Sequence, residues 1–449
     1  MRTDLKIPQE VKPLAKESKA SDAPQEQPKK KKKKHGFLRF LAVFLTVVLF
    51  LEGCYCFVVF TDISVIRNLR EKYIETALST MSHQWLAKAI FPSYMVDEVQ
   101  ARMYYQQMAQ AGHKSERPAV ETSVNENGET IYLDPTDTTD PTDTAEQSDP
   151  LSITDEESFY SVFWELSRTS FEDYCNSHPA VLKDGWENIY INRAGIEDTG
   201  TDIYTTMGEQ VLAIDAKNRI LLLRVRDTGY IGVLAVAKDP AQLRCCASSG
   251  IGDYGEDLDV IVRNNDGLLG ITASGFYDPN GGGTGGEIAG YAMCDGKEYG
   301  PHYDPSTGYK RIELTRDNKM YITDTSDAVQ ADVTDAVEFS PALIIDGELM
   351  VGGFYGDWSG INPRACIGQS ESGEILMLVI EGRQTTRSIG ADVETCANIL
   401  KRHNGYTAMN MDGGTSAVMW YNGEYVTKCS NRNLHSRYLP NAWVYGYDS

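Results

Sequence analysis

A long, almost entirely apolar stretch near the start of the chain limits what it can fold into. Residues 37–60 read FLRFLAVFLTVVLFLEGCYCFVVF, and about 20 apolar residues are enough for a helix to cross a bilayer. Arg39 can extend its charged end to the headgroups, whereas Glu52 is costly within hydrocarbon unless it is neutral, interfacial or partnered. The stretch therefore predicts one transmembrane helix over residues 36–60.

An unbroken lysine run, Lys29–Lys34, precedes this stretch. The positive-inside rule then places a polar, disordered basic tail, residues 1–35, in the cytoplasm. The predicted localisation is the cell membrane, single-pass, with the C-terminal domain extracellular. A cleaved signal peptide fits less well because the apolar run is long and the segment before it is extended. A lipobox-like Leu51–Cys54 also fits poorly, because it contains a glutamate and apolar residues continue beyond it.

Composition limits the partners and the metal chemistry. The 449-residue chain has a formal net charge of −22 and a pI of about 4.8, which argues against nucleic acid as a partner. Of its nine cysteines, Cys54 and Cys56 lie in the apolar stretch. The remaining seven are an odd number, so at least one thiol is free or pairs between chains. No CxxC pair occurs, so the sequence gives no support for a zinc site.

The chain after the apolar stretch divides into three parts. Residues 61–120 have apolar side chains at near-helical spacing and predict a helical stalk, with a face for the membrane or for self-association with a second copy. A simple helical spacer fits equally well. Residues 121–157 are acidic and rich in Thr and Pro, which predicts a linker that holds the globular part away from the membrane. Residues 158–449 have the pattern of apolar and polar residues that is typical of a globular domain.

Hydrophobic patterning predicts the class of this domain. Helical spacing runs from Phe159 to Tyr174, and a second helix is expected over 391–403, with a polar start and a glycine stop. Residues 258–262 fit a short helix or a strand. Short apolar runs separated by turns predict strands at 211–214, 219–225 and 230–236. The predicted fold class is α+β: a mixed, largely antiparallel sheet with packed helices, preceded by one transmembrane helix and a stalk.

A turn between two β-prone runs carries the most chemically informative residues. Residues 407–420 read TAMNMDGGTSAVMW, with the carboxylate of Asp412 followed by Gly413, Gly414, Thr415 and Ser416. Glycines let the backbone approach a ligand closely, and rigid flanking strands hold a carboxylate in a fixed position. An ordinary Asp-Gly hairpin turn has the same local sequence, so the turn alone leaves both readings open.

Further blocks occur along the chain in a particular order: PALIIDG at 341–347, PRACIG at 363–368, and EGR at 381–383. Together with NMDGGTS at 410–416, the run from Pro341 to Tyr447 resembles the phosphodiester glycosidase family. The resemblance starts near Leu212 and covers about half of the chain. Thr415 stands where the family has a third glycine, and Ser274 stands where an Asn-Gly-Gly-Phe-Phe block has its asparagine.

The resemblance implies hydrolysis of a sugar-1-phosphodiester to free sugar and a phosphomonoester. Arginine suits the phosphodiester because its planar fork matches phosphate oxygens. Arg364 and Arg383 are the first candidates and Arg437 the third. A carboxylate is needed to stabilise or attack the oxocarbenium-like anomeric carbon, or to activate water. Asp412 is the first choice and Glu381 the second, and a phosphate leaving group lessens the need for a general acid.

Residues around these positions are the candidates for substrate binding. The backbone N–H groups at the two glycines of the turn can bind phosphate oxygens. The predicted substrate-binding set is Ser274, Gly275, Asn410, Gly413, Gly414, Thr415, Ser416 and Arg437. A structural explanation is available for several candidates: Glu381 and Arg383, two apart on a strand, would face one side and pair, and Asp412 would cap a turn.

Other chemistries receive less support. Residues 281–286 satisfy GxGxxG, but a strand-like segment follows where a dinucleotide site needs a helix. His302, His403 and His435 are acid–base candidates by residue type alone, and His435 is favoured because it is close to Arg437. The sequence requires no cofactor and leaves the metal unknown, although Asp278, Glu287 and Asp412 are oxygen ligands compatible with calcium.

The expected substrate is a sugar-phosphate or polysaccharide of the cell envelope, a hypothesis that rests on the membrane topology. A non-catalytic glycan-binding or polysaccharide assembly factor is the alternative, because a fold does not fix a function and Ser274 departs from the family pattern. Transfer of the glycosyl group to an acceptor other than water is a third hypothesis.

Overall fold

The computed structural model describes residues 35–80, 83–118, 120, 122–124, 130–132, 149–197, 200–353 and 360–446. The lysine run, nearly all of the predicted basic tail and most of the predicted acidic linker lie outside these residues. The chain forms two compact units, Met1–Thr61 and Asp62–Ser449. The first unit contains helix α1, His35–Phe60. Among the described residues, α1 is the one helix whose length and apolar composition would let it cross a membrane.

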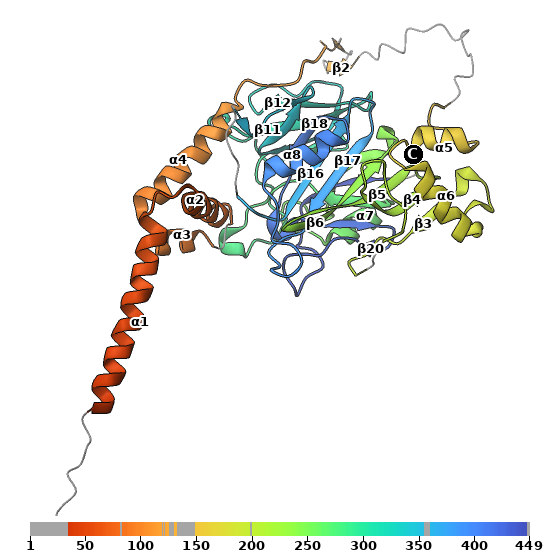
Figure 1. Cartoon of the computed structure of the whole chain (residues 1–449). Coiled ribbons are helices and arrows are strands. Elements are labelled where there is room, and N and C mark those ends of the chain that lie inside the picture. The colour runs from red at the N-terminus through yellow and green to blue at the C-terminus, as the bar shows by residue number, and fades with distance from the viewer. Residues whose placement is uncertain are drawn as a thin grey trace, which may run out of the picture. The chain divides into compact units, whose positions relative to one another are not determined.

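The second unit is built on three antiparallel sheets and seven described helices (Figure 1). The helices are α2 (Ser64–Leu78), α3 (Gln84–Ile90), α4 (Ser93–Ala109), α5 (Glu156–Val162), α6 (Arg168–Ser177), α7 (Leu258–Asn264) and α8 (Val393–Arg402). All described strand pairs within the three sheets are antiparallel. The predicted α+β class with a largely antiparallel sheet is therefore confirmed.

The largest sheet has nine strands in the order β15-β14-β18-β16-β17-β6-β5-β4-β3. Their bounds are β3 (Tyr190–Asn192), β4 (Gln210–Asp215), β5 (Ile220–Asp227), β6 (Tyr230–Ala237), β14 (Ala342–Ile345), β15 (Glu348–Leu349), β16 (Arg364–Ser370), β17 (Ile375–Ile380) and β18 (Gly405–Asn410). The three strands predicted between residues 211 and 236 are β4, β5 and β6.

Two five-stranded sheets complete the unit. One has the order β20-β19-β8-β21-β7 and the other β10-β9-β13-β11-β12. The bounds in the first are β7 (Leu243–Ala247), β8 (Leu269–Thr272), β19 (Met419–Tyr421), β20 (Glu424–Tyr425) and β21 (Asn441–Tyr445). Those in the second are β9 (Ala292–Cys294), β10 (Lys297–Tyr299), β11 (Lys310–Thr315), β12 (Met320–Asp324) and β13 (Val333–Phe339). A separate hairpin pairs β1 (Thr122–Val124) with β2 (Thr130–Tyr132).

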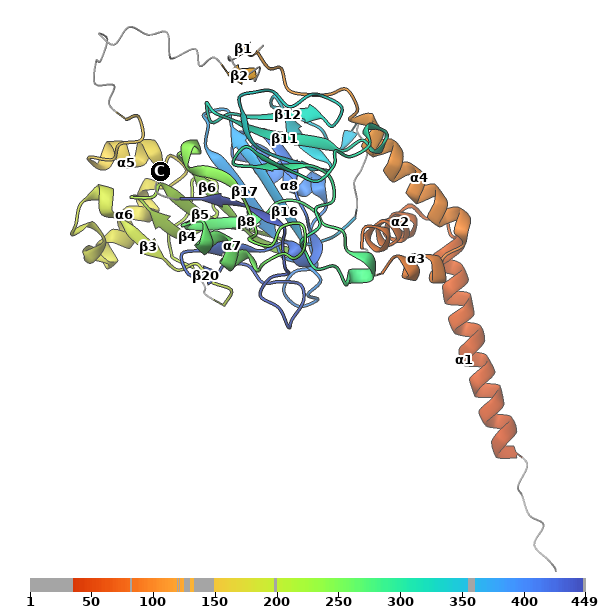
Figure 2. The same ribbon diagram turned by 180° about the vertical axis from the view of Figure 1, so that it is seen from behind.

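Alternation along the strands explains the layers. In β5, Leu221 and Leu223 belong to a core shared with Phe159 of α5 and Ile399 of α8. Ile220 and Leu222, on the opposite face, belong to a core that includes residues of the two smaller sheets. Successive strand residues point to opposite faces. The nine-stranded sheet is thus covered by helices on one face and by sheets on the other (Figure 2).

Helix ends follow from local sequence. The helix predicted at 391–403 is α8, and the carboxylate of Asp392 accepts a hydrogen bond from the backbone N–H of Thr395 at 2.9 Å, as an N-cap does. The continuous helix predicted from Phe159 to Tyr174 is instead two helices, because Ser167 caps the start of α6. Residues 258–262 lie in a helix, α7.

Helices α2–α4, which occupy the predicted stalk, lie in the same compact unit as the sheets. The buried amide of Gln110 donates to the carbonyls of Ala342 and Met350, at 2.9 and 2.6 Å, and accepts from the backbone N–H of Ala342. Glu75 accepts from the N–H of Gly360 at 2.9 Å. These contacts fix the segment against one edge of the nine-stranded sheet.

The spacer role predicted for residues 121–157 stays a prediction, because most of this segment lies outside the described residues. Before it, Arg117 pairs with Glu313 of β11 at 2.6 Å. Near its C-terminal end, Asp149 pairs with Arg219, the residue before β5. The domain boundaries near 120 and 158 stay predictions.

Candidate active site

The turn after β18 lies where the ends of three strands from two sheets meet. The N–H of Asp412 donates to the carbonyl of Ala273, just after β8, at 3.2 Å. The N–H of Met411 donates to Ala365 of β16, and that of Gly414 donates to Pro363 at 2.9 Å. Gly414 has φ +61, a conformation that glycine adopts without strain. Strand pairing therefore fixes the backbone on both sides of the carboxylate.

Asp412 is partly buried and forms no ion pair within the described part of the chain. Burial raises the pKa of its carboxyl group to about 6, and a hydrogen bond from Ser416, the nearby Arg437 and the N–H of Gly413 oppose this rise. A carboxyl group with such a pKa is largely ionised at neutral pH and can still exchange a proton near it.

Arg383 lies beside the same turn. Its backbone has φ +59, and a Cβ added at Gly414 would lie 3.1 Å from its Nη2 atom, so the glycine makes room for the guanidinium. The Nη2 atom donates to Thr80 Oγ1 at 3.2 Å and to Asn362 Oδ1 at 3.1 Å. Thr80 follows α2, so the N-terminal helical segment reaches the candidate site.

Arg383 and Arg364 form a cationic pair without carboxylate partners among the described residues. Burial lowers the pKa of Arg383, the neighbouring Arg364 lowers it further, and Asp412 raises it. The Arg364 guanidinium donates to the carbonyls of Ala391 and Gly360, at 3.1 and 2.6 Å. Two adjacent cations held by neutral groups retain the capacity to bind an anion.

Arg437 takes a different role. It forms a bidentate pair with Asp278, at 2.6 and 3.0 Å, and lies over the ring of Phe276. This pairing raises the pKa of Arg437 and lowers that of Asp278. The N–H of Gly283 also donates to Asp278, which closes the glycine-rich loop against this ion pair. Arg437 is therefore already neutralised, unlike Arg383.

Comparison with known proteins agrees with this arrangement. Residues 266–445 match the family model described as phosphodiester glycosidase (NAGPA). These residues therefore carry a phosphodiester glycosidase domain by similarity to that model. The matched range lies inside the predicted range of 212–447, and it contains Asp412, Arg364, Arg383 and Arg437. No curated protein matches the chain.

Three solved structures are similar to this chain. One is the zebrafish N-acetylglucosamine-1-phosphodiester α-N-acetylglucosaminidase catalytic domain auto-inhibited by its pro-peptide, with 16% identity over 60% of this chain and 91% of that chain, and a TM-score of 0.40. A hypothetical protein from Synechocystis has 13% identity over 53% of this chain and 63% of its own chain, with a TM-score of 0.37. A putative exported protein from Burkholderia pseudomallei has 13% identity over 49% of this chain and 75% of its own chain, with a TM-score of 0.38.

Glu381, the second carboxylate candidate of this phosphodiester glycosidase domain, is buried in an ion pair. Its carboxylate binds Arg387 at 2.5 and 2.9 Å and accepts from the backbone N–H of Lys428 at 3.0 Å. The sequence predicted that Glu381 pairs with Arg383 on one face of a strand, and this prediction is wrong. Strand β17 ends at Ile380, and the chain turns before Arg383, so the two side chains do not share a strand face. All the carboxylate contacts of Glu381 thus serve to hold the 381–388 turn to residue 428.

Ser274 and Asn410 are buried next to the turn. Ser274 Oγ accepts from Asn441 Nδ2 at 3.0 Å, and its N–H donates to the Asn441 side chain at 2.9 Å. Asn410 Nδ2 donates to the carbonyl of Ser340, while its Oδ1 is buried without a hydrogen-bond partner in the described residues. At Gly275 a Cβ would lie 2.8 Å from the Phe339 ring, so the glycine allows that aromatic ring to approach.

The remaining turn residues have structural contacts. The Thr415 hydroxyl accepts a hydrogen bond from the Ser430 hydroxyl at 3.4 Å. The Thr415 carbonyl accepts a hydrogen bond from the Cys429 thiol at 3.3 Å. At Gly413 a Cβ would lie 2.8 Å from the carbonyl of Pro363. The roles predicted for the substrate-binding set stay predictions, but the structure brings Asp412, Gly414, Ser416 and Arg383 together.

The three histidine candidates have partners outside the turn. His302 pairs with Glu338 at 2.6 Å, and His403 lies 3.1 Å from Glu209. His435, favoured by the sequence, stacks on Tyr425 at a cavity of about 940 Å³. Within the described ranges, no group of three or more His, Cys, Asp or Glu side chains could hold a metal ion.

Sequence reasoning missed Thr80 and Asn362, the two groups that hold Arg383. Asn362 directly precedes the Pro363-Arg364 block, so its position offered a signal. Thr80 lies about 300 residues from Arg383 in the chain, in a segment predicted to be a stalk, and its contact arises only from tertiary folding.

Proposed function

We propose that this domain hydrolyses a glycosyl-1-phosphodiester at the bond between the anomeric carbon and the phosphate oxygen. The observation that carries the proposal is an arginine without a carboxylate partner among the described residues, Arg383, beside a partly buried carboxylate without an ion pair, Asp412. The family match over residues 266–445 supports a glycosidase-type hydrolase. Neither charge is needed to neutralise the other in a direct pair, so each is available to substrate.

The two charges suit the two halves of the reaction. Arg383, with Arg364 behind it, binds the phosphodiester and stabilises negative charge as the phosphate leaves. The Asp412 carboxylate stabilises the positive charge that develops on the anomeric carbon. Water supplies a hydroxyl group to that carbon and a proton to the departing phosphate, which gives free sugar and a phosphomonoester. The leaving phosphate is acidic, so little protonation by the protein is required.

The test is product release by the full-length chain in detergent micelles. The substrates are UDP-N-acetylglucosamine and a simple N-acetylglucosamine-1-phosphodiester, and the variants are Asp412→Asn and Arg383→Met. Asp227→Asn and Arg263→Met are matched controls, because both residues are exposed and outside the site. Release by wild type and controls that collapses in both site variants supports the proposal. Equal release in all five proteins overturns it.

The alternative function, glycan binding without turnover, has a distinct outcome in the same experiment. Sugar-phosphodiester binding detected by calorimetry, together with no phosphomonoester from any of several sugars, favours a binding or assembly factor. Transfer instead of hydrolysis is detected by adding a sugar alcohol and analysing the products for a new glycoside.

The proposed location is the outer face of the cell membrane, with α1 as the anchor and envelope glycans as substrates. The apolar composition of α1 and the lysine run before it support this topology. Protease treatment of intact cells and of lysed cells tests it, because an external domain is degraded in both. Protection in intact cells would contradict the proposal. Self-association through α2–α4 stays a prediction, testable by light scattering.

A further inference from the structure

Two tyrosines next to Asp412 have no role in the chemistry described so far. Tyr303 and Tyr309 stack with ring centroids 3.9 Å apart and an interplanar angle of 28°, and their hydroxyl groups share a hydrogen bond. Tyr309 also meets Phe339 edge-on at 6.1 Å. That ring approaches Gly275, two residues after Ala273, whose carbonyl binds the N–H of Asp412.

The electrostatics agree with this placement. Burial is the main reason that the pKa of Tyr303 and that of Tyr309 are raised, and the charge of Asp412 adds to the rise in both. Both phenols therefore stay neutral at physiological pH. A neutral hydroxyl group donates and accepts hydrogen bonds, so it suits the hydroxyl groups of a sugar better than a phosphate.

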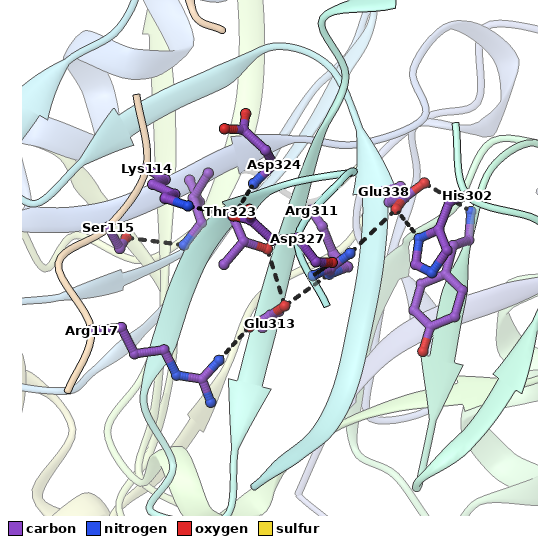
Figure 3. Close-up of polar contacts among 12 residues, drawn as sticks. Lys114, Ser115, Arg117, His302, Arg311, Glu313, Thr323, Asp324, Asp327 and Glu338 are labelled. Carbon is purple, nitrogen blue, oxygen red and sulfur yellow. Dashed lines mark hydrogen bonds and ion pairs between the residues drawn. The ribbon is translucent and has the colours of Figure 1, made fainter. Parts of the chain in front are cut away.

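Tyr303 is held firmly in place by its surroundings. A Cβ added at Gly290 would lie 2.2 Å from Tyr303 Cε2, so the ring packs closely on this glycine. The carboxylate of Glu338 accepts from the N–H of Tyr303 at 2.8 Å and from that of Tyr291 at 3.3 Å. His302, the residue before Tyr303, directs its Nδ1 atom to the same carboxylate at 2.6 Å (Figure 3).

Glu338 is in turn fixed by buried charges of the adjacent strand. Arg311 lies 3.6 Å from it and bonds Glu313 at 2.8 Å, and all three side chains are fully buried. Arg117 closes the row from the N-terminal segment (Figure 3). The loop that carries Tyr303 is therefore attached to a rigid row of ion pairs and not to solvent-exposed groups.

We infer that Tyr303 and Tyr309 form the sugar-binding side of the site, with Glu338 as the positioning residue that holds Tyr303 beside Asp412. The inference rests on the proposed function. Arg383 reaches the turn at Gly414, from a different set of elements, so phosphate and sugar contact separate parts of the site. The ligand class is an uncharged pyranose whose hydroxyl groups bind the two phenols.

The test separates sugar binding from phosphate binding in the full-length chain. Tyr303→Phe and Tyr309→Phe are compared with Tyr406→Phe, a control at the opposite end of β18. Binding of N-acetylglucosamine, glucose, galactose, mannose and inorganic phosphate is measured by calorimetry. We expect the Kd of the preferred sugar to rise about five- to tenfold in the two site variants, as for one lost hydrogen bond, with the Kd of phosphate unchanged.

Two outcomes would overturn the inference. One is a sugar Kd that is equal in the site variants, the control and wild type, and the other is the absence of sugar binding by wild type. Because binding is measured without turnover, absence of product would count against the proposed function alone.

Glu338→Gln tests the positioning role. We expect a raised sugar Kd with an unchanged phosphate Kd. If this variant unfolds, His302→Asn is used, because it removes only the contact with Glu338 and the stacking on Tyr291 from a half-exposed side chain. We expect the sugar Kd to rise about twofold. An equal rise in both Kd values would indicate general damage and overturn the positioning role.

Discussion

Two regions of this molecule hold charged side chains in opposite ways. In the sheet that contains β11 and β13, Arg117, Arg311, Glu313 and Glu338 alternate in sign along a row of contacts. At the turn after β18, the partly buried Asp412 and the exposed Arg383 have no ion-pair partner among the described residues. In the first region each charged side chain contacts one of opposite sign, whereas in the second region the charged side chains form no ion pair.

The difference separates structural charges from functional ones. A compensated buried charge is costly to remove, because its partner is left alone in a medium of low polarity. An uncompensated charge near a cleft destabilises the fold slightly and is available to a ligand. The raised pKa of Asp412 and the lowered pKa of Arg383 are signs of the second case. The predictions that follow test this distinction.

The largest expected effect is on catalysis at the turn. Asp412→Asn keeps the shape of the side chain and removes its charge, so we expect kcat/KM for a sugar-1-phosphodiester to fall at least about 10³-fold. Steady-state kinetics with circular dichroism as a folding check measure this. A fall of less than tenfold would mean that the carboxylate at the turn is structural.

The next effect is on stability in the compensated region. Glu313→Gln leaves Arg117 and Arg311 without their shared carboxylate, so we expect a loss of about 3–5 kcal/mol in the free energy of unfolding. Urea denaturation of the full-length chain measures it. Glu157→Gln, which breaks the exposed pair with Arg168, should leave the midpoint unchanged. Equal midpoints for both variants would remove the basis of the comparison.

A smaller effect is expected at the cation of the turn. Arg383→Lys keeps the charge but loses the planar fork, so we expect kcat/KM to fall about 10- to 100-fold. The affinity for inorganic phosphate, measured by calorimetry, should fall with it. Unchanged phosphate affinity would show that the anion binds elsewhere.

The pKa of Asp412 gives a dependence on pH with a defined sign. Its ionised form is required, so kcat/KM should fall about tenfold per pH unit below about 6. The native pKa lies above the ordinary value of 3.8, so the protonated form favours folding: this contribution is complete below 3.8 and is lost as the pH rises through 6. Asp412→Asn should therefore be more stable than wild type at pH 7 by about 1–3 kcal/mol. Equal unfolding midpoints from pH 4 to 7 would contradict the assignment.

The smallest effect tests the contact from the N-terminal segment. Thr80→Val removes the hydroxyl that accepts from Arg383, so we expect kcat/KM to fall about three- to tenfold with unchanged stability. Ser79→Ala is the neighbouring control, because the Ser79 hydroxyl bonds only within α2. Identical kinetics for the two variants would show that Arg383 needs no support from this segment.

Local patterns predicted the strands and the site turn well. Alternation and turn residues predicted β4, β5 and β6, and the order of short blocks pointed to Asp412 and Arg383, which the structure brings to the same turn. These features depend on residues close in sequence, or on motifs that carry the family pattern. The sequence ranked Asp412 above Glu381, but it could not predict that Arg387 folds back onto Glu381.

Contacts between segments far apart in the chain could not be predicted from the sequence either. Nothing in the local pattern of Gln110 indicates that its amide completes the hydrogen bonding of Ala342, more than 200 residues away. Amphipathic helices with an unknown partner are equally consistent with a stalk or with a docked segment. The position of Tyr303 and Tyr309 likewise depends on pairing between β11 and β13.

The docking of Arg117 and Asp149 on the same unit has a consequence for how the chain tolerates proteolysis. A single cut in the acidic segment between them would divide the polypeptide without dividing the fold. The two pieces would stay associated through the amide of Gln110, the hydroxyl of Thr80 and the ion pair of Arg117. Helices α2–α4 and the sheets would then behave as two subunits of a nicked protein, and Arg383 would keep its support from Thr80.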